Sequence, residues 1–442
     1  MYQVILLVLG VVGLLLMISK LHIHAFLSLL IVSLVLGVAS GMPLADVANT
    51  VAAGFGGTMQ SIGIVIVCGV IMGEVLERTG GAKKIADSLL RLVGIKRAPL
   101  ATALTGGVVS IPTFCDSGFV ILNPVIKALS VEGKIPYMVL VSALMCGLLT
   151  THSLVPPTPG PIAAAGILGA DVGVVMLYGL IISVPVILVT LLWCNSKYIR
   201  NKFPDLAVED ADAAKAFKED VSKAPSTFMS YLPIVAPIIL IIVRSFATLY
   251  ADAELGWVKF VNFIGTPYIA LLIGTLIAFL LPKENKNGEV TDSWVSSAIA
   301  TSAEILLITG IAGCFGKILQ AMGVGDILAG ALSSLHLPSV MLPFIISAIV
   351  LIAQGSATVA LTTTSAIILP LLPTLGISPE LAVIAIAGGS FCGVFPNGSY
   401  FWCVTKLAGF DIKKGYVAVT ATTFVMGLTA LVSILIFSLF VH

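Results

Sequence analysis

Two ionisable side chains stand in stretches of the sequence that are otherwise apolar or rich in helix-breaking residues. Asp116 lies in the stretch 110–118, and His152 lies in the stretch 150–161. A carboxylate is costly in apolar surroundings, so it is a candidate for a group that takes up and releases a proton. A histidine titrates near neutral pH and can also hold a carboxylate. We predict that Asp116 and His152 couple the activity to protons; the alternatives are a structural hydrogen bond for Asp116 and a satisfied core position for His152.

Hydroxyl and amide side chains gather in the same two stretches and in two more, 354–365 and 393–400. Such groups can hydrogen-bond a hydroxylated ligand. Each stretch also holds Gly or Pro, and a helix that restarts after a break attracts anions through its free N–H groups and its dipole. The sequence therefore predicts a site for a small polar anion, with Pro kinks and internally bonded hydroxyls as the alternative. The predicted binding side chains are Thr113, Ser117, Thr151, Ser153, Ser356, Thr358, Asn397 and Ser399.

The elements that position these residues must lie in a membrane. Of the 442 residues, 58% are hydrophobic and only 10% are charged, and the mean hydropathy is +1.11. A soluble domain carries roughly 25% charged residues. The composition therefore predicts an all-α polytopic membrane protein with the lipid bilayer as its solvent. The net charge of +1 and the lack of a basic tract exclude nucleic acid as an expected partner.

Lysine and arginine are distributed unevenly among the polar segments. Segments 77–97 and 195–223 hold six each, whereas 41–58 and 321–337 hold none. Because Lys and Arg accumulate on the cytoplasmic side, the first two segments are predicted to lie inside and the N-terminus outside. The long polar stretch 196–228 is then a cytoplasmic linker between two halves of the chain.

The two halves resemble each other weakly. Gly80 aligns with Gly323 at an offset of 243, and Asp171 aligns with Asp411 at an offset of 240. The charges of 80–93 lie inside, while 323–336 lacks Lys and Arg and is predicted outside. We therefore predict two inverted-topology repeats with re-entrant hairpins and broken helices, which is typical of secondary transporters. The predicted division is N-terminal transmembrane helices in 1–58, repeat 1 in 59–195 (hairpin about 98–130, broken helix about 136–170), the linker 196–228, connecting transmembrane helices in 229–295, and repeat 2 in 296–442 (hairpin about 338–376, broken helix about 380–408).

Motifs of enzyme sites are missing from the sequence. There is no His spacing of a metal site, no nucleophile elbow and no phosphate loop. Residues 323–326 spell the G-x-G-D of an intramembrane aspartyl protease, but the second aspartate that this chemistry needs is not found in a matching motif. The seven cysteines lie in apolar stretches and are predicted to be reduced packing residues. We therefore expect a protein that is not an enzyme and has no metal and no cofactor.

Several stretches of the chain together resemble the gluconate permease family, over the whole length. They are Gly54-Phe55-Gly56-Gly57-Thr58, Thr79-Gly80-Gly81-Ala82, Phe114-Cys115-Asp116-Ser117-Gly118-Phe119, Thr151-His152, Pro156-Pro157-Thr158-Pro159-Gly160-Pro161, Gly355-Ser356-Ala357-Thr358-Val359-Ala360 and Ser378-Pro379-Glu380. The resemblance implies a proton symporter of the bacterial inner membrane that imports gluconate or a related sugar acid. It also implies a homodimer of the ion transporter superfamily with an elevator-like movement. Sodium is the less favoured coupling ion.

The chain departs from the family pattern at three places. Asp116 stands where the family usually has Glu, and Thr158 stands where it usually has His. An Asn-Asp pair is usual near Asn397, where this chain has Pro396-Asn397-Gly398-Ser399. A different substrate, such as D-serine or another hydroxy acid, is therefore an alternative to gluconate. A passive anion channel is the alternative from another class.

Overall fold

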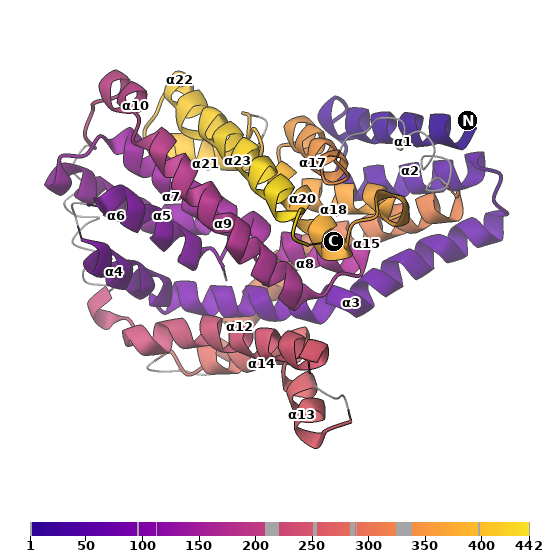
Figure 1. The fold of residues 1–442 in the computed structure, drawn as a ribbon, viewed down its shortest axis with the longest axis horizontal. Helices are drawn as coiled ribbons and strands as arrows, with labels where there is room; N and C mark the ends of the chain where they lie inside the picture. Colours follow the sequence, from indigo (N-terminus) through magenta and orange to yellow (C-terminus); the bar gives the residue numbers. More distant parts are fainter. Residues whose placement is uncertain are drawn as a thin grey trace.

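A computed structural model describes residues 2–94, 97–111, 113–207, 221–250, 254–282, 288, 290–323, 338–396 and 398–441. Every regular element within these ranges is a helix (Figure 1). Five of the helices are long and apolar enough to cross a membrane, or up to seven if each of two bent pairs counts as one span. The predicted fold class, an all-α polytopic membrane protein, is therefore confirmed.

The helices of the first half follow one another closely. They are α1 (Tyr2–Ser19), α2 (Ala25–Ala39), α3 (Leu44–Arg78), α4 (Gly81–Val93), α5 (Ala98–Val109), α6 (Cys115–Gly133), α7 (Tyr137–Leu154), α8 (Pro159–Leu168), α9 (Val172–Cys194) and α10 (Lys197–Lys202). Helix α3 bends by 44° between Gln60 and Gly63, close to the predicted boundary at residue 58.

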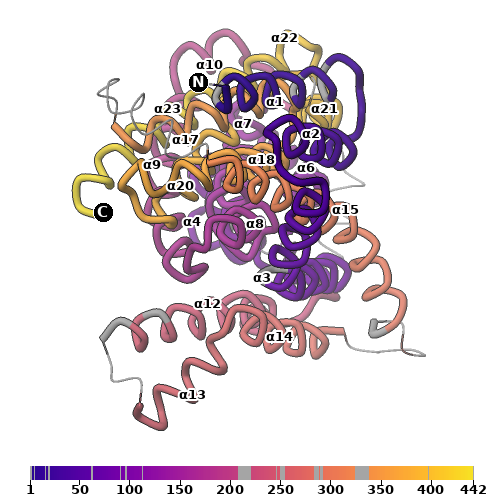
Figure 2. The backbone as a smooth tube through the Cα atoms, turned by 90° about the vertical axis from the view of Figure 1, so that its right-hand side faces the viewer, coloured from indigo at the N-terminus to yellow at the C-terminus, as the bar shows by residue number. Residues whose placement is uncertain are grey.

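The helices of the second half begin after the linker. They are α12 (Thr227–Tyr250), α13 (Gly256–Ile264), α14 (Pro267–Ala278), η3 (Val290–Trp294), α15 (Val295–Ala321), α17 (Met341–Gln354), α18 (Ala357–Ile368), α19 (Leu372–Leu375), α20 (Pro379–Gly389), α21 (Ser399–Leu407), α22 (Ile412–Gly415), η4 (Tyr416–Ala421) and α23 (Thr422–Phe437). Helices α12, α13 and α14 lie below the main body in both views (Figures 1 and 2), where α12 packs on α4 and α14 packs on α3.

Helices α3 and α15 form a closely packed antiparallel pair. At one end, the Arg78 guanidinium lies 5.6 Å from the Trp294 ring. Along the crossing, a Cβ atom added to Gly54 would lie 2.7 Å from the backbone of Cys314, and one added to Gly313 would overlap the Thr58 hydroxyl. Small residues allow helix backbones to approach each other without a hydrophobic driving force in lipid. This crossing therefore explains the small residue at Gly54 and the position of Thr58.

Helix α7 forms the centre of the molecule. Every residue of α7, from Tyr137 to Leu154, is buried inside the protein. Helix α5 crosses α7 at Gly147, where an added Cβ would overlap the carbonyl of Ala103. Helix α9 packs on the other side, with Gly179 against the carbonyl of Leu154. A central helix with no lipid-facing surface can carry polar side chains, and α7 carries Thr151, His152 and Ser153 near its end.

Residues aligned between the two halves have matching local structure. Gly169 and Gly409 both adopt the left-handed conformation, with φ of 72° and 66°. Asp171 accepts the first N–H groups of α9, and Asp411 accepts an N–H of α22. The order of elements after α3 is similar to the order after α15, although residues 324–337 lie outside the described ranges. The opposite orientation of the halves stays a prediction.

Candidate functional site

Four gaps between helices lie where the sequence predicts breaks. They are 110–114 between α5 and α6, 155–158 between α7 and α8, 355–356 between α17 and α18, and 390–398 between α20 and α21. Gly and Pro explain them, because Pro removes a helical hydrogen bond and Gly permits unusual backbone angles. Gly355, for example, adopts a φ of 76° between α17 and α18.

The first gap touches both the second and the fourth. The rings of Phe114 and His152 lie 6.1 Å apart between centroids, which joins the first gap to the end of α7. The Cys403 thiol, on α21, lies 3.8 Å from the backbone carbonyl of Asp116. Helix α21 packs on α6, so the start of α21 is held beside the start of α6.

The third gap contacts the second and the fourth gap as well. A Cβ atom on Gly160 would lie 3.8 Å from the Thr358 hydroxyl, which places the start of α8 beside the start of α18. A Cβ atom on Gly398 would lie 2.5 Å from the carbonyl oxygen of Gly355, so the fourth gap lies directly on the third. The four gaps therefore contact one another in a closed sequence, which we call the break ring (residues 110–111, 113–117, 152–160, 354–358, 390–396 and 398–403).

Four helices begin at the break ring, namely α6, α8, α18 and α21. Only α18 has a side-chain cap, since Ser356 accepts the N–H of Val359. Phe114, Thr158 and Gly398 precede the other three helices without a side-chain cap. Uncapped N–H groups and the positive ends of helix dipoles favour an anion. Helix α8 contributes less than the others because two of its first three residues are proline.

Six buried side-chain polar atoms of the break ring have no hydrogen-bond partner, and others occur elsewhere in the described chain, for example at Thr102 and Trp294. Within the described part of the chain, those of the break ring include Asp116 Oδ1, His152 Nδ1, Ser153 Oγ and the Tyr400 hydroxyl. Both amide atoms of Gln354 are in the same situation. A buried polar group without a partner costs about 1–3 kcal/mol. Such a cluster is therefore a place where a polar ligand would be bound.

Other predicted binding side chains serve the protein's own backbone. Thr113 donates to the carbonyl of Val109 at 2.6 Å, and Thr151 donates to that of Gly107 on α5 at 2.7 Å. Ser356 caps α18. These residues lie in the break ring, but their hydroxyls are used to shape it.

The remaining predicted residues are distributed around the break ring. Thr358 is half-buried at the contact of α8 with α18, and Ser399 is exposed at the start of α21. Ser117 lies beside the Glu77 carboxyl group of α3. Asn397 lies outside the described residues.

Tyr400 and Gln354 have buried polar atoms without partners, and the sequence analysis names neither residue. Both occur in predicted break stretches, and that position was the available signal. Tyr400 is one helical turn from Cys403, so it faces α6, and its hydroxyl lies within electrostatic range of Asp116 and Cys115. Only the packing of α21 on α6 reveals this neighbourhood.

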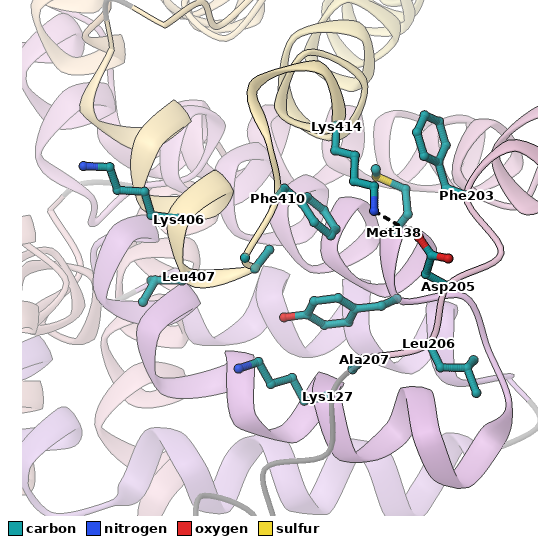
Figure 3. Close-up of a pocket in the computed structure, with 13 residues that line it drawn as sticks. Lys127, Met138, Phe203, Asp205, Leu206, Ala207, Lys406, Leu407, Phe410 and Lys414 are labelled. Carbon is teal, nitrogen blue, oxygen red and sulfur yellow. Dashed lines mark hydrogen bonds and ion pairs between the residues drawn. The ribbon is translucent and has the colours of Figure 1, made fainter.

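A cavity of about 430 Å³ lies at the far ends of α6 and α21 (Figure 3). Its lining includes Lys127, Phe410 and the linker residue Asp205, whose carboxylate pairs with Lys414 at 3.0 Å. On the side of this cavity, Tyr137 donates to Asn123, and Asn123 donates to the carbonyl of Leu407. The cavity therefore marks the linker end of the α6–α21 pair, while the break ring lies at the other end.

Comparisons with known proteins agree with this architecture. The model of the "GntP family permease" matches residues 2–440. The high-affinity gluconate transporter of Escherichia coli is 34% identical, over 89% of this chain and 89% of its own. The inner membrane permease YgbN of the same organism is 34% identical over 95% of each chain, and its D-serine transporter DsdX is 31% identical over 96% of each.

A solved structure shares the fold. The YdaH transporter of Alcanivorax borkumensis superposes with a TM-score of 0.65 at 17% identity, covering 90% of this chain and 89% of that one. The family match also confirms the expected class, a permease of the bacterial inner membrane and not an enzyme. With a family model that matches nearly end to end and relatives above 30% identity, the chain belongs to the GntP permease family.

Proposed function

We propose that the protein is a secondary active transporter that imports gluconate or a related small hydroxylated monocarboxylate together with protons. The observation that carries the proposal is the break ring, where four helices begin beside buried polar atoms that lack protein partners. The uncapped helix starts suit a carboxylate. The hydroxyl of Tyr400 and the amide of Gln354 suit the hydroxyls of a sugar acid.

The position of Asp116 supports the proposed proton coupling. Its carboxylate stands in the first turn of α6, at one of the helix starts proposed to bind the substrate carboxylate. Two carboxylates in one poorly hydrated site repel each other unless one of them carries a proton. Substrate and proton would therefore bind together. His152, buried beside Phe114, is proposed as the second group in this coupling.

An elevator-like movement is proposed for the transport step. Helices α8 and α18, which begin at the break ring, pack against the α3–α15 pair. The α3–α15 pair would act as the scaffold, in a homodimer, and the helices of the break ring would move as a unit. A ligand shifts such an equilibrium only through different affinities for the two states. Binding at all four helix starts at once would supply that difference.

Uptake of labelled gluconate into proteoliposomes with an imposed pH gradient tests the proposal. We expect accumulation above equilibrium that collapses on addition of a protonophore. Uptake that never exceeds equilibrium would instead favour a passive anion channel. Accumulation of gluconate that requires sodium and does not depend on pH would overturn proton coupling, and the protein would still be a secondary active transporter.

The substrate is tested by a thermal-shift screen of the purified protein. A ligand that binds only the folded state raises its stability by mass action, about 2.7 kcal/mol at a hundredfold excess over Kd. We expect gluconate or another sugar acid to give the largest shift. A larger shift with D-serine would assign the amino acid instead, in keeping with the relative that is named for it.

A further inference from the structure

A second cavity, of about 630 Å³, lies between the α3–α15 pair and the α8–α18 pair. Its lining includes Gly54, Thr58 and Gln60 of α3, the end of α8 at Gly166–Gly169, and Lys317 of α15. Helices α8 and α18 run from the break ring to this cavity, as α6 and α21 run from the break ring to the cavity of Figure 3. The ten residues of α8 separate the second cavity from the break ring by roughly 14 Å.

The charge distribution predicts that the second cavity lies on the side of the membrane opposite the linker. Arg78 and the cation-rich helix α4 mark one end of the α3–α15 pair, since Arg78 contacts Trp294 at the start of α15. Lys317 lies near the other end of α15. Lys and Arg accumulate on the cytoplasmic side, so a lysine at the outer end departs from this rule.

Lys317 is available to a ligand. Its side chain is exposed and lines the cavity. Neither Lys317 nor Gln60 has a hydrogen bond or ion pair within the described part of the chain, and no Asp or Glu is among the described residues that line the cavity. An ammonium group and an amide can donate to a carboxylate and a hydroxyl, respectively.

We infer that this cavity is an outer capture site, where Lys317 binds the carboxylate of an incoming monocarboxylate before it reaches the break ring. The inference rests on the proposed function. A cavity that carries a single sign of charge raises the local concentration of the opposite ion, so Lys317 would act on substrate capture.

Uptake kinetics of Lys317→Ala test the inference. We expect KM for gluconate to rise about fivefold, which is the upper range for one exposed charge pair, with turnover unchanged. Lys317→Arg should restore the wild-type KM. The matched control is Lys259→Ala, which removes an exposed lysine of α13 that pairs with Glu254 and does not line the cavity. An unchanged KM in Lys317→Ala, or an equal rise in Lys259→Ala, would overturn the inference while uptake by the wild type upholds the transporter.

A second readout does not depend on transport. The Gln60→Cys variant places a thiol in the cavity, and its reaction rate with a thiosulfonate reports on the charge there. The wild type gives the background reaction, because six natural cysteines are buried and Cys403 is half-buried. In intact cells, a membrane-impermeant anionic thiosulfonate should react faster than a cationic one, and Lys317→Ala should lower this rate ratio about fivefold. The inference is wrong if the introduced cysteine does not react from outside, or if the ratio of the anionic to the cationic reaction rate is the same with and without Lys317. This result holds even if no sugar acid is carried.

Discussion

Tyr400 and Tyr137 carry the same hydroxyl group in different situations. Tyr137 donates to Asn123, whereas the Tyr400 hydroxyl is buried at the break ring without a partner in the described chain. We therefore expect Tyr400→Phe to leave the melting temperature unchanged and to raise KM about tenfold, because only a ligand loses a hydrogen bond. Tyr137→Phe should destabilise the protein by about 1–2 kcal/mol and leave KM unchanged. Thermal unfolding and uptake measured on both variants check this pair.

The opposite outcome is that Tyr400→Phe and Tyr137→Phe lower the melting temperature equally. A drop in melting temperature for Tyr400→Phe as large as that for Tyr137→Phe would show that the Tyr400 hydroxyl supports the fold. It would then be removed from the substrate site. The exposed Tyr198→Phe, whose hydroxyl meets Lys202 at the protein surface, serves as a control for the substitution itself.

Asp116 is the carboxylate on which proton coupling depends. Asp116→Asn keeps the shape of the side chain and removes the site for the transported proton. We expect this variant to lose accumulation of gluconate against its gradient and to retain exchange of internal for external substrate. Counterflow and net uptake in the same proteoliposomes separate the two activities. Full accumulation would remove Asp116 from the coupling role, and Asp46→Asn, at an exposed position of α3, is the matched control.

The sequence points to Asp116 and His152 because an ionisable side chain conflicts with apolar surroundings. Both residues have buried polar atoms without partners in the described chain, as does the neighbouring Ser153. The Thr113 hydroxyl bonds to the carbonyl of Val109 four residues earlier, as in the alternative of internally bonded hydroxyls, whereas the Thr151 hydroxyl bonds to the carbonyl of Gly107 on another helix. Which hydroxyl remains free depends on helix packing.

At the scale of elements, the contact of Gly398 with Gly355 joins two breaks through their backbones. The φ of Gly398 is −93°, so an alanine there is free of backbone strain and meets only the Gly355 carbonyl. We expect Gly398→Ala to push the start of α21 away from α18, at a cost of about 1–3 kcal/mol, and to lower uptake at least tenfold. Gly13→Ala in α1, where an added Cβ meets nothing within 4 Å, should be silent.

A graded result would strengthen this argument. Gly160→Ala places its Cβ against the end of the Leu361 side chain, which can move aside. Its effect on uptake should therefore be smaller than that of Gly398→Ala. Equal uptake by Gly398→Ala and the wild type would mean that the two breaks need not touch for transport.

The places where helices end can be predicted from Pro and Gly in the sequence. The contacts among the four gaps cannot be predicted in this way. Pro156 and Gly355 predicted interruptions, and helices end within a few residues of both. That the four gaps lie against one another depends on crossings such as Gly147 on Ala103, which are set by tertiary packing. The first and last gaps are separated by nearly 280 residues, and periodicity carries no information over such a distance.

At the scale of the whole molecule, the charge distribution predicts which face meets the cytoplasm. Lys259→Cys on α13 should react with an impermeant maleimide in intact cells, because one candidate span, Thr227–Thr248, separates α13 from the linker that is predicted to be cytoplasmic. Lys202→Cys at the end of α10 should react only after the membrane is permeabilised. The reverse pattern would invert the orientation of the chain and, with it, the assignment of the outer cavity.

The complete burial of α7 has a consequence for biosynthesis. This helix offers no surface to lipid, and it packs against α20 and α23, which the ribosome produces more than 200 residues later. Until they arrive, the polar end of α7 with His152 lacks its final neighbours. The first half alone should consequently be degraded after insertion, and both halves should be rescued when they are synthesised together as separate polypeptides.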